Sequence, residues 1–137
     1  MAPHDAAVTI PLTCVFVAFL LIYLPKIPLS LAMAKEGKGY DNANPRAQQD
    51  RLTGWGLRAK NAHANAFESF PPFAAAVVVA HLAHADPKWM TILAVAYVAA
   101  RAIYPFIYMA NLATLRSLVW SIGFGATAGL FMLPWIA

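Results

Sequence analysis

Polar side chains form a line along one face of an otherwise apolar segment. The line consists of Arg58, Asn61, Asn65 and Glu68, and the residues from 74 to 80 that follow carry no charge. At about 100° per residue, these four side chains fall within a stripe about 80° wide on a helix. A charged group inside a bilayer costs about 3 kcal/mol on insertion scales, so it is kept mainly where it faces a partner, a ligand or water. The stripe therefore predicts a binding site.

A second polar stripe lies on a later apolar segment. Its members fall on one helical face, and they are Tyr97, Arg101, Tyr104, Tyr108 and Asn111. A buried guanidinium needs an anion as much as a buried carboxylate needs a cation. The two stripes are therefore expected to meet, and two interpretations of that meeting are open.

In the first interpretation, Glu68 and Arg101 form an ion pair that holds two helices in register and no ligand is involved. The second interpretation rests on the excess of donors, because arginine, asparagine and tyrosine side chains far outnumber the one carboxylate. Such a set suits a small anionic or zwitterionic ligand. We favour the ligand, with Glu68 binding an ammonium group and the arginines binding carboxylates or a thiolate.

The composition places these stripes in a membrane protein. The chain is 61% hydrophobic and 12% charged, whereas soluble domains are about 25% charged. Its long apolar runs each reach the length of about 20 residues that a membrane helix needs. We expect an all-α fold, an integral membrane four-helix bundle that makes residues 1–137 a single domain. The expected helices cover residues 7–34, 57–84, 88–112 and 116–136, with a loop over 35–56.

Prolines and small residues predict where these helices deviate or pack closely. Pro25 and Pro28 predict that the end of the first helix kinks or unwinds. Pro71 and Pro72 predict an interruption of the second helix, and Pro105 predicts a bend in the third. Small residues recur every four positions in the last helix, at Ser121, Gly125 and Gly129, a spacing that lets helices approach closely in lipid.

Basic residues are concentrated between the end of the first predicted helix and the first turn of the second, and they are Lys35, Lys38, Arg46, Arg51, Arg58 and Lys60. The positive-inside rule then predicts a cytoplasmic loop over residues 35–56 and both termini outside.

Cys14 is the single cysteine, so no disulfide forms within the chain. His81 and His84 lie near Asp86, but two histidines at a helix end are usually interfacial, and we assign no metal. Neither the charge nor the motifs indicate a nucleic-acid partner.

Two motifs resemble those of a known family. The run from Asn65 to Glu68 with the later Pro72, and the Arg101–Tyr104–Tyr108 spacing followed by Arg116, are similar to signatures of the MAPEG family, the membrane-associated proteins in eicosanoid and glutathione metabolism. The resemblance covers nearly the whole chain and points to a bacterial branch, which implies the inner membrane. One position departs: the family arginine four residues before the signature asparagine is Asn61 here.

The resemblance implies a homotrimer with glutathione, as co-substrate, between neighbouring protomers near the cytoplasmic side. Asn65 and Glu68 would bind its polar groups, with Arg58 and Asn61 beside them, and Arg101, Tyr104 and Tyr108 of the adjacent protomer would complete the pocket. The catalytic residues would be Arg116 and Ser117, which would stabilise the thiolate.

The expected function is that of a membrane-bound glutathione-dependent transferase or peroxidase acting on a hydrophobic electrophile or a lipid peroxide. The alternative is a non-catalytic subunit of the same fold that binds lipid or joins a larger membrane complex. A small transporter is disfavoured because the chain has no internal repeat of the kind that many carriers show.

Overall fold

The computed structural model of the protein describes residues 3–136, which are helical throughout apart from short connections. The elements in chain order are α1 (Pro3–Ile22), α2 (Lys26–Lys35), α3 (Pro45–Arg51), α4 (Gly54–Leu82), α5 (Pro87–Met109), α6 (Ala113–Met132) and the short 3-10 helix η1 (Leu133–Trp135). Compared with the predicted bounds, the first helix is divided in two and the predicted loop contains α3. The remaining helices begin and end within a few residues of the expected positions.

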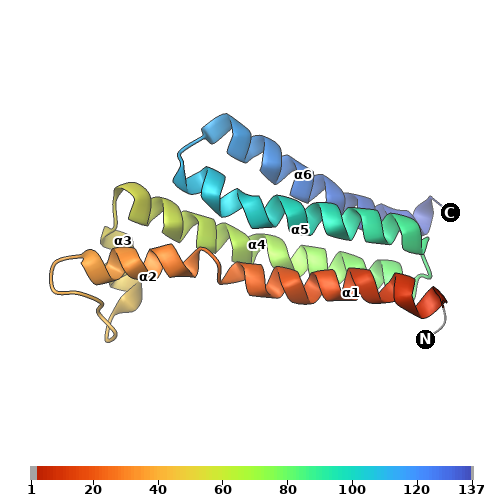
Figure 1. The fold of residues 1–137 in the computed structure, drawn as a ribbon, viewed down its shortest axis with the longest axis horizontal. Coiled ribbons are helices and arrows are strands. Elements are labelled where there is room, and N and C mark those ends of the chain that lie inside the picture. The colour runs from red at the N-terminus through yellow and green to blue at the C-terminus, as the bar shows by residue number, and fades with distance from the viewer. Residues whose placement is uncertain (1–2, 137) are drawn as a thin grey trace.

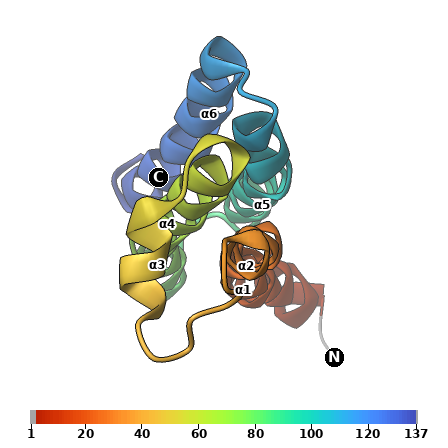
Figure 2. The same ribbon diagram turned by 90° about the vertical axis from the view of Figure 1, so that its left-hand side faces the viewer.

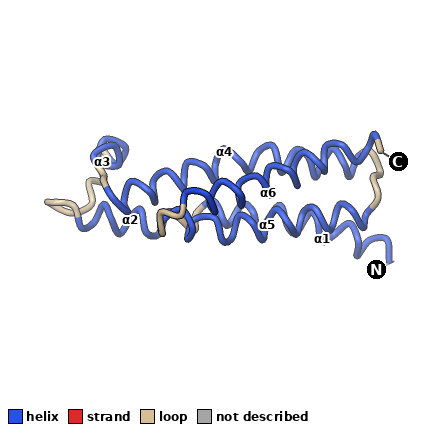
Figure 3. The backbone as a smooth tube through the Cα atoms, turned by 90° about the horizontal axis from the view of Figure 1, so that it is seen from above, coloured by secondary structure: helices blue, strands red, loops and turns tan. Residues whose placement is uncertain are grey.

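The long helices lie side by side along one axis (Figure 1). α1 and α2 follow one another along one side of α4 and α5, and α6 packs against α4 and α5 on the other side (Figures 1 and 2). The start of α1 and the end of α6 lie at the same end of the molecule, whereas α3 and its loop lie at the opposite end. Seen from above, the polar loop projects beyond the helices (Figure 3).

Three segments are long and apolar enough to cross a membrane, namely Thr9–Lys35, Pro87–Met109 and Ala113–Trp135. α4 has 29 residues, ample for a span, but the polar residues of its first half keep it out of this group. The structure thus confirms an all-helical protein with helices fit for a membrane. A bundle of four spanning helices stays a prediction.

The first helix unwinds locally at Pro25, where a kink or unwinding was predicted, and a turn over residues 23–25 divides it into α1 and α2. α1 ends at Ile22, and the amide of Lys26 donates to the carbonyl of Tyr23 at 3.1 Å instead of continuing the α-helical pattern. The carbonyl of Ile22 is thereby left free, and Nδ1 of His63 on α4 lies 2.8 Å from it. Because a carbonyl only accepts, Nδ1 must carry the proton in this contact. His63 therefore compensates for the break, a role that its place outside the polar stripe did not reveal.

The predicted interruption of the second helix at Pro71 and Pro72 was wrong. α4 continues through both prolines, and α5 continues through Pro105. Pro71 and Pro72 are exposed, whereas the next residue, Phe73, is fully buried and stacks on Tyr97 of α5 with ring centroids 3.7 Å apart. Burial of the Phe73 ring against Tyr97 keeps α4 helical at the two prolines, where backbone hydrogen bonds are lost.

Close helix approach occurs at glycines, but not all of those expected. A methyl group on Gly129 would lie 3.1 Å from Leu93 of α5, whereas one on Gly125 would meet nothing within 4 Å. The closest approach is at Gly56, where a methyl group would lie 2.9 Å from the β-carbon of Ala32 on α2. Gly56 therefore allows the start of α4 to lie directly against α2.

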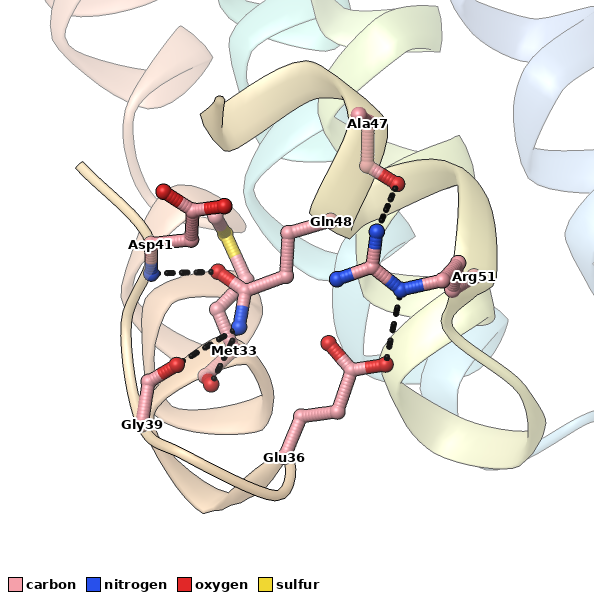
Figure 4. Close-up of polar contacts among 7 residues, drawn as sticks. All are labelled: Met33, Glu36, Gly39, Asp41, Ala47, Gln48 and Arg51. Carbon is pink, nitrogen blue, oxygen red and sulfur yellow. Dashed lines mark hydrogen bonds and ion pairs between the residues drawn. The ribbon is translucent and has the colours of Figure 1, made fainter. Parts of the chain in front are cut away.

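The loop between α2 and α4 is organised by the buried amide of Gln48 on α3 (Figure 4). Its Nε2 donates to the carbonyls of Met33 at 3.0 Å and Gly39 at 2.8 Å, and its Oε1 accepts from the amide of Asp41 at 2.9 Å. An ion pair between Arg51 and Glu36, with a nitrogen–oxygen distance of 3.6 Å, lies beside it. One side chain thus connects the end of α2, the loop and α3.

A second ion pair joins α3 to α4 at the surface. Nζ of Lys60 donates to Oδ1 of Asp50 at 2.6 Å. This hydrogen bond and the charge of Lys60 hold the pKa of the Asp50 carboxyl below its ordinary value. Since Asp50 is fully exposed, the pair contributes little to stability.

Replacing Gln48 with alanine should loosen the loop. Gln48→Ala removes three hydrogen bonds and leaves buried backbone groups without partners, so we expect a loss of about 2 to 3 kcal/mol in unfolding free energy. Hydrogen exchange in detergent should rise over residues 33–41. Gln49→Ala on the same helix is the control, and equal protection in both variants would contradict the assigned role.

Replacing Gly56 with alanine should separate α2 from α4. The added methyl group has no room beside Ala32, so we expect destabilisation of about 1 to 3 kcal/mol. The matched change Gly125→Ala meets open space in a helix and should be neutral or stabilise by up to about 1 kcal/mol. Thermal unfolding in detergent compares the two, and a Gly56→Ala protein as stable as wild type would refute the close contact.

Candidate functional site

A cavity of about 580 Å³ opens between α4, α5 and α6. Most of the predicted site residues line it: Asn61, Asn65, Glu68, Tyr104, Tyr108, Arg116 and Ser117. We call it the polar pocket. Both polar stripes and the start of α6 thus face one space within a single chain.

The α4 side of the polar pocket carries its only carboxylate. Glu68 is exposed, and within residues 3–136 no ion pair includes it. Asn61 and Asn65 lie two turns and one turn before it on the same face. The direct pairing of Glu68 with Arg101, the interpretation that we did not favour, is absent from this part of the chain.

One guanidinium and the rings of two tyrosines lie on the opposite side. The guanidinium of Arg116 lies 4.5 Å from the ring centroid of Tyr108, within the range of a cation–π contact. The ring of Tyr104 meets that of Tyr108 edge to face at 5.7 Å. Ser117 donates its hydroxyl proton to the carbonyl of Ala113 at 3.2 Å, which leaves its oxygen as an acceptor. Arg116 is therefore held in place by a ring and has no carboxylate partner in residues 3–136.

Two predicted site residues do not line the polar pocket. Arg101 is buried, 7% exposed, and its Nη2 donates to Oδ1 of Asn65 at 2.9 Å, with its guanidinium 4.3 Å from the ring centroid of Tyr104. Arg58 donates from Nε to the carbonyl of Met109 at 3.0 Å. Arg101 thus orients Asn65 and lines the cavity that adjoins the polar pocket, and Arg58 is engaged at the end of α5.

A second cavity of about 460 Å³ adjoins the first, lined by α4, by Tyr97 and Arg101 of α5, and by α6. Its walls are mostly apolar, and they include Pro72, Gly123, Phe124, Thr127, Ala128, Phe131 and Met132. We call it the apolar chamber. Asn65, Glu68 and Trp120 line both cavities. A polar compartment and an apolar compartment therefore share a wall.

Sequence reasoning missed three residues of the polar pocket, namely Ala64, Trp120 and Ser121. Trp120 lies two turns into α6 and stacks on Phe124 with ring centroids 5.3 Å apart. The available signal was spacing: Trp120 lies four residues after Arg116 and hence on the same helix face.

The predicted contribution of a neighbouring protomer stays a prediction. The expectation assigned Arg101, Tyr104 and Tyr108 to an adjacent copy, whereas in the structure of one chain these residues already face Asn65 and Glu68 of the same chain.

Asn65 and Asn61 should differ sharply when replaced with leucine. Asn65→Leu removes the oxygen that accepts from the buried Arg101, so we expect destabilisation of about 2 to 3 kcal/mol. Asn61→Leu breaks no hydrogen bond of the described structure and should leave unfolding nearly unchanged. Chemical unfolding in detergent measures both, and similar stabilities would contradict the role of the Arg101–Asn65 bond.

One family of known proteins matches nearly the whole chain. The model of the MAPEG family matches residues 10–136. No curated protein and no solved structure was found to match the chain. The family match covers most of α1 and all of the later helices that line the polar pocket and the apolar chamber, and on that basis the chain belongs to the MAPEG family.

Proposed function

We propose that this protein is a membrane-bound glutathione-dependent transferase or peroxidase. The observation that carries the proposal is the convergence of one unpaired carboxylate, one ring-supported guanidinium and several amide and phenol groups on the polar pocket. Its volume of about 580 Å³ lies within the range of small-molecule sites, about 300 to 1,000 Å³. Glutathione is the co-substrate expected from membership of the family.

The groups of glutathione find counterparts in the lining of the polar pocket. Its ammonium group pairs with Glu68, which has no cation partner within residues 3–136. Its carboxylates accept hydrogen bonds from the amide of Asn61 and the hydroxyl groups of Tyr104 and Tyr108. Asn65, held by Arg101, supplies an oriented amide at the base of the pocket.

Arg116 is the proposed activating residue. A free thiol has a pKa near 8.5, and a fixed cation beside it lowers that value, so more thiolate is present at neutral pH. The thiolate sulfur attacks an electrophilic carbon, the carbon–sulfur bond forms as the leaving group departs, and the thiol proton goes to solvent. The ring of Tyr108 preorganises the guanidinium of Arg116 for this task. The oxygen of Ser117 lies in the same pocket and would help to orient the thiol.

The second substrate is proposed to be apolar because the apolar chamber adjoins the polar pocket. Phe124, Phe131 and Met132 offer apolar surface to a hydrophobic electrophile or a lipid peroxide. The shared wall at Glu68 and Trp120 would bring its reactive end next to the thiolate.

We further propose that four helices span the inner membrane as one domain and that the chain forms a homotrimer. The loop before α4 would then be cytoplasmic, with both termini outside.

A non-catalytic subunit is the alternative, and one observation favours it. Arg101, Asn65 and Tyr104 contact one another across α4 and α5, so part of the polar stripe serves helix packing. Glu68 and Arg116 weigh against this alternative, since no ion pair of the described residues uses either of them.

Titration of the detergent-purified protein with glutathione by calorimetry tests the proposal directly. Saturable heat with conjugation of a reactive aryl halide would support a transferase. Absence of any binding would refute the glutathione proposal, and binding without turnover on any electrophile or peroxide would favour the non-catalytic alternative.

Arg116→Ala separates activation from binding. We expect turnover to fall by about 10²-fold or more, the size of effect seen when one preorganised stabilising group is lost, while the dissociation constant for glutathione changes little. Arg46→Ala removes an exposed arginine outside both cavities and serves as the control. An equal loss of binding and turnover in Arg116→Ala would show that Arg116 holds the ligand and does not activate its thiol.

A further inference from the structure

We propose that Arg58 is a positioning residue that caps the end of α5 and thereby fixes the turn from which Arg116 projects. The sequence interpretation assigned Arg58 to ligand binding. In the structure its guanidinium is turned to the backbone of α5 and does not line the polar pocket. The catalytic consequence rests on the proposed function, whereas the structural role of Arg58 does not.

The last four carbonyls of any α-helix lack partners inside that helix. At the end of α5, three of these carbonyls accept from the turn that follows. The carbonyl of residue 106 accepts from the amide of residue 110, that of 107 from 112, and that of 108 from 111. The fourth is the carbonyl of Met109, which accepts from Nε of Arg58 at 3.0 Å. Arg58 therefore completes the hydrogen bonding of this helix end, and its positive charge suits the negative end of the helix dipole.

The turn after α5 is short and has little other support. It spans residues 110–112, contains Asn111 with a φ of 60°, and leads directly into α6 at Ala113. Residues 110–115 are all exposed, and this end of α6 stands away from α4 (Figure 1). Beyond Arg58, the anchor is the side chain of Met109, which packs against the buried cluster of α2 and α4 that includes Leu29, Met33 and Ala59.

Arg116 lies in the first turn of α6, and its amide donates to the carbonyl of Leu112 within the turn at 2.9 Å. Any shift of the turn relative to α4 therefore moves Arg116 relative to Glu68, which lies across the polar pocket. Arg58 spans this gap, because it leaves α4 two to three turns before Glu68 and ends at α5. Its effect on the site is thus through the backbone.

Hydrogen exchange of the full-length protein in detergent tests the structural role without any ligand. Arg58→Gln should raise exchange over residues 109–116 several-fold and leave the core of α1 and α5 unchanged. Arg58→Lys, which keeps a cationic donor, should restore most of the protection. Lys60→Gln removes a cation two residues along the same helix and should leave residues 109–116 as in wild type. Unchanged exchange in Arg58→Gln, or no rescue by lysine, would overturn the proposal.

The functional consequence is tested through the pH dependence of thiolate formation by bound glutathione, measured by its absorbance. Arg58→Gln should raise the apparent pKa of the bound thiol, with Arg58→Lys closer to wild type. In an Arg116→Ala background, Arg58→Gln should add nothing, because both changes act on one group. Additive effects would show a separate role for Arg58. If wild type binds no glutathione, the proposed function fails, but the exchange measurement still decides the role of Arg58.

Discussion

The hydrogen bond between Arg101 and Asn65 is the interaction on which the arrangement of the site depends. The bond crosses from α5 to α4. Arg101 is a residue with 7% of its surface exposed, its guanidinium lies beside the ring of Tyr104, and the amide oxygen of Asn65 is its acceptor. Breaking such a contact would leave a buried charge without a partner, which is costly in a medium of low polarity. The interaction therefore fixes both the register of α4 on α5 and the orientation of the amide that faces the polar pocket.

Because Arg101 donates to Asn65 and not to Glu68, the carboxylate of Glu68 has no ion-pair partner among the described residues. A carboxylate paired with Arg101 would have neutralised both groups and closed the space between the helices. Instead Arg101 is stabilised by uncharged groups, and the charges that face the polar pocket, Glu68 and Arg116, lie on different helices without an ion pair in residues 3–136. The pocket thus presents separated charges of opposite sign, which is an arrangement suited to a zwitterionic molecule.

Much of this was predictable from periodicity. The two stripes predicted a shared site, and in the structure Asn65, Glu68, Tyr104 and Tyr108 line one cavity, because helical spacing fixes which side chains share a face. Periodicity does not show which group on a neighbouring helix a side chain will bind. Arg58 and Arg101 were therefore assigned to the ligand although the structure uses them to bind a carbonyl and an amide.

Predictions from proline and glycine positions failed where packing between helices had the larger effect. Pro25 breaks its helix and Pro71 does not, although both lack an amide hydrogen, because the residues around Pro71 are held by the stacking of Phe73 on Tyr97. Similarly, Gly56 was read only as a loop residue, since its importance lies in a neighbour 24 positions earlier in the chain, Ala32. Contacts between distant segments leave little trace in one sequence.

The wall common to the polar pocket and the apolar chamber has a thermodynamic consequence. Glu68 and Trp120 border both spaces, so a molecule that changes the position of either side chain alters the shape offered to a molecule in the other space. Occupancy of the two compartments is then linked, and the linkage free energy is identical whichever compartment fills first. Under the proposed function, Glu68 of α4 and Trp120 of α6 would carry this linkage between the two substrates without a change of fold.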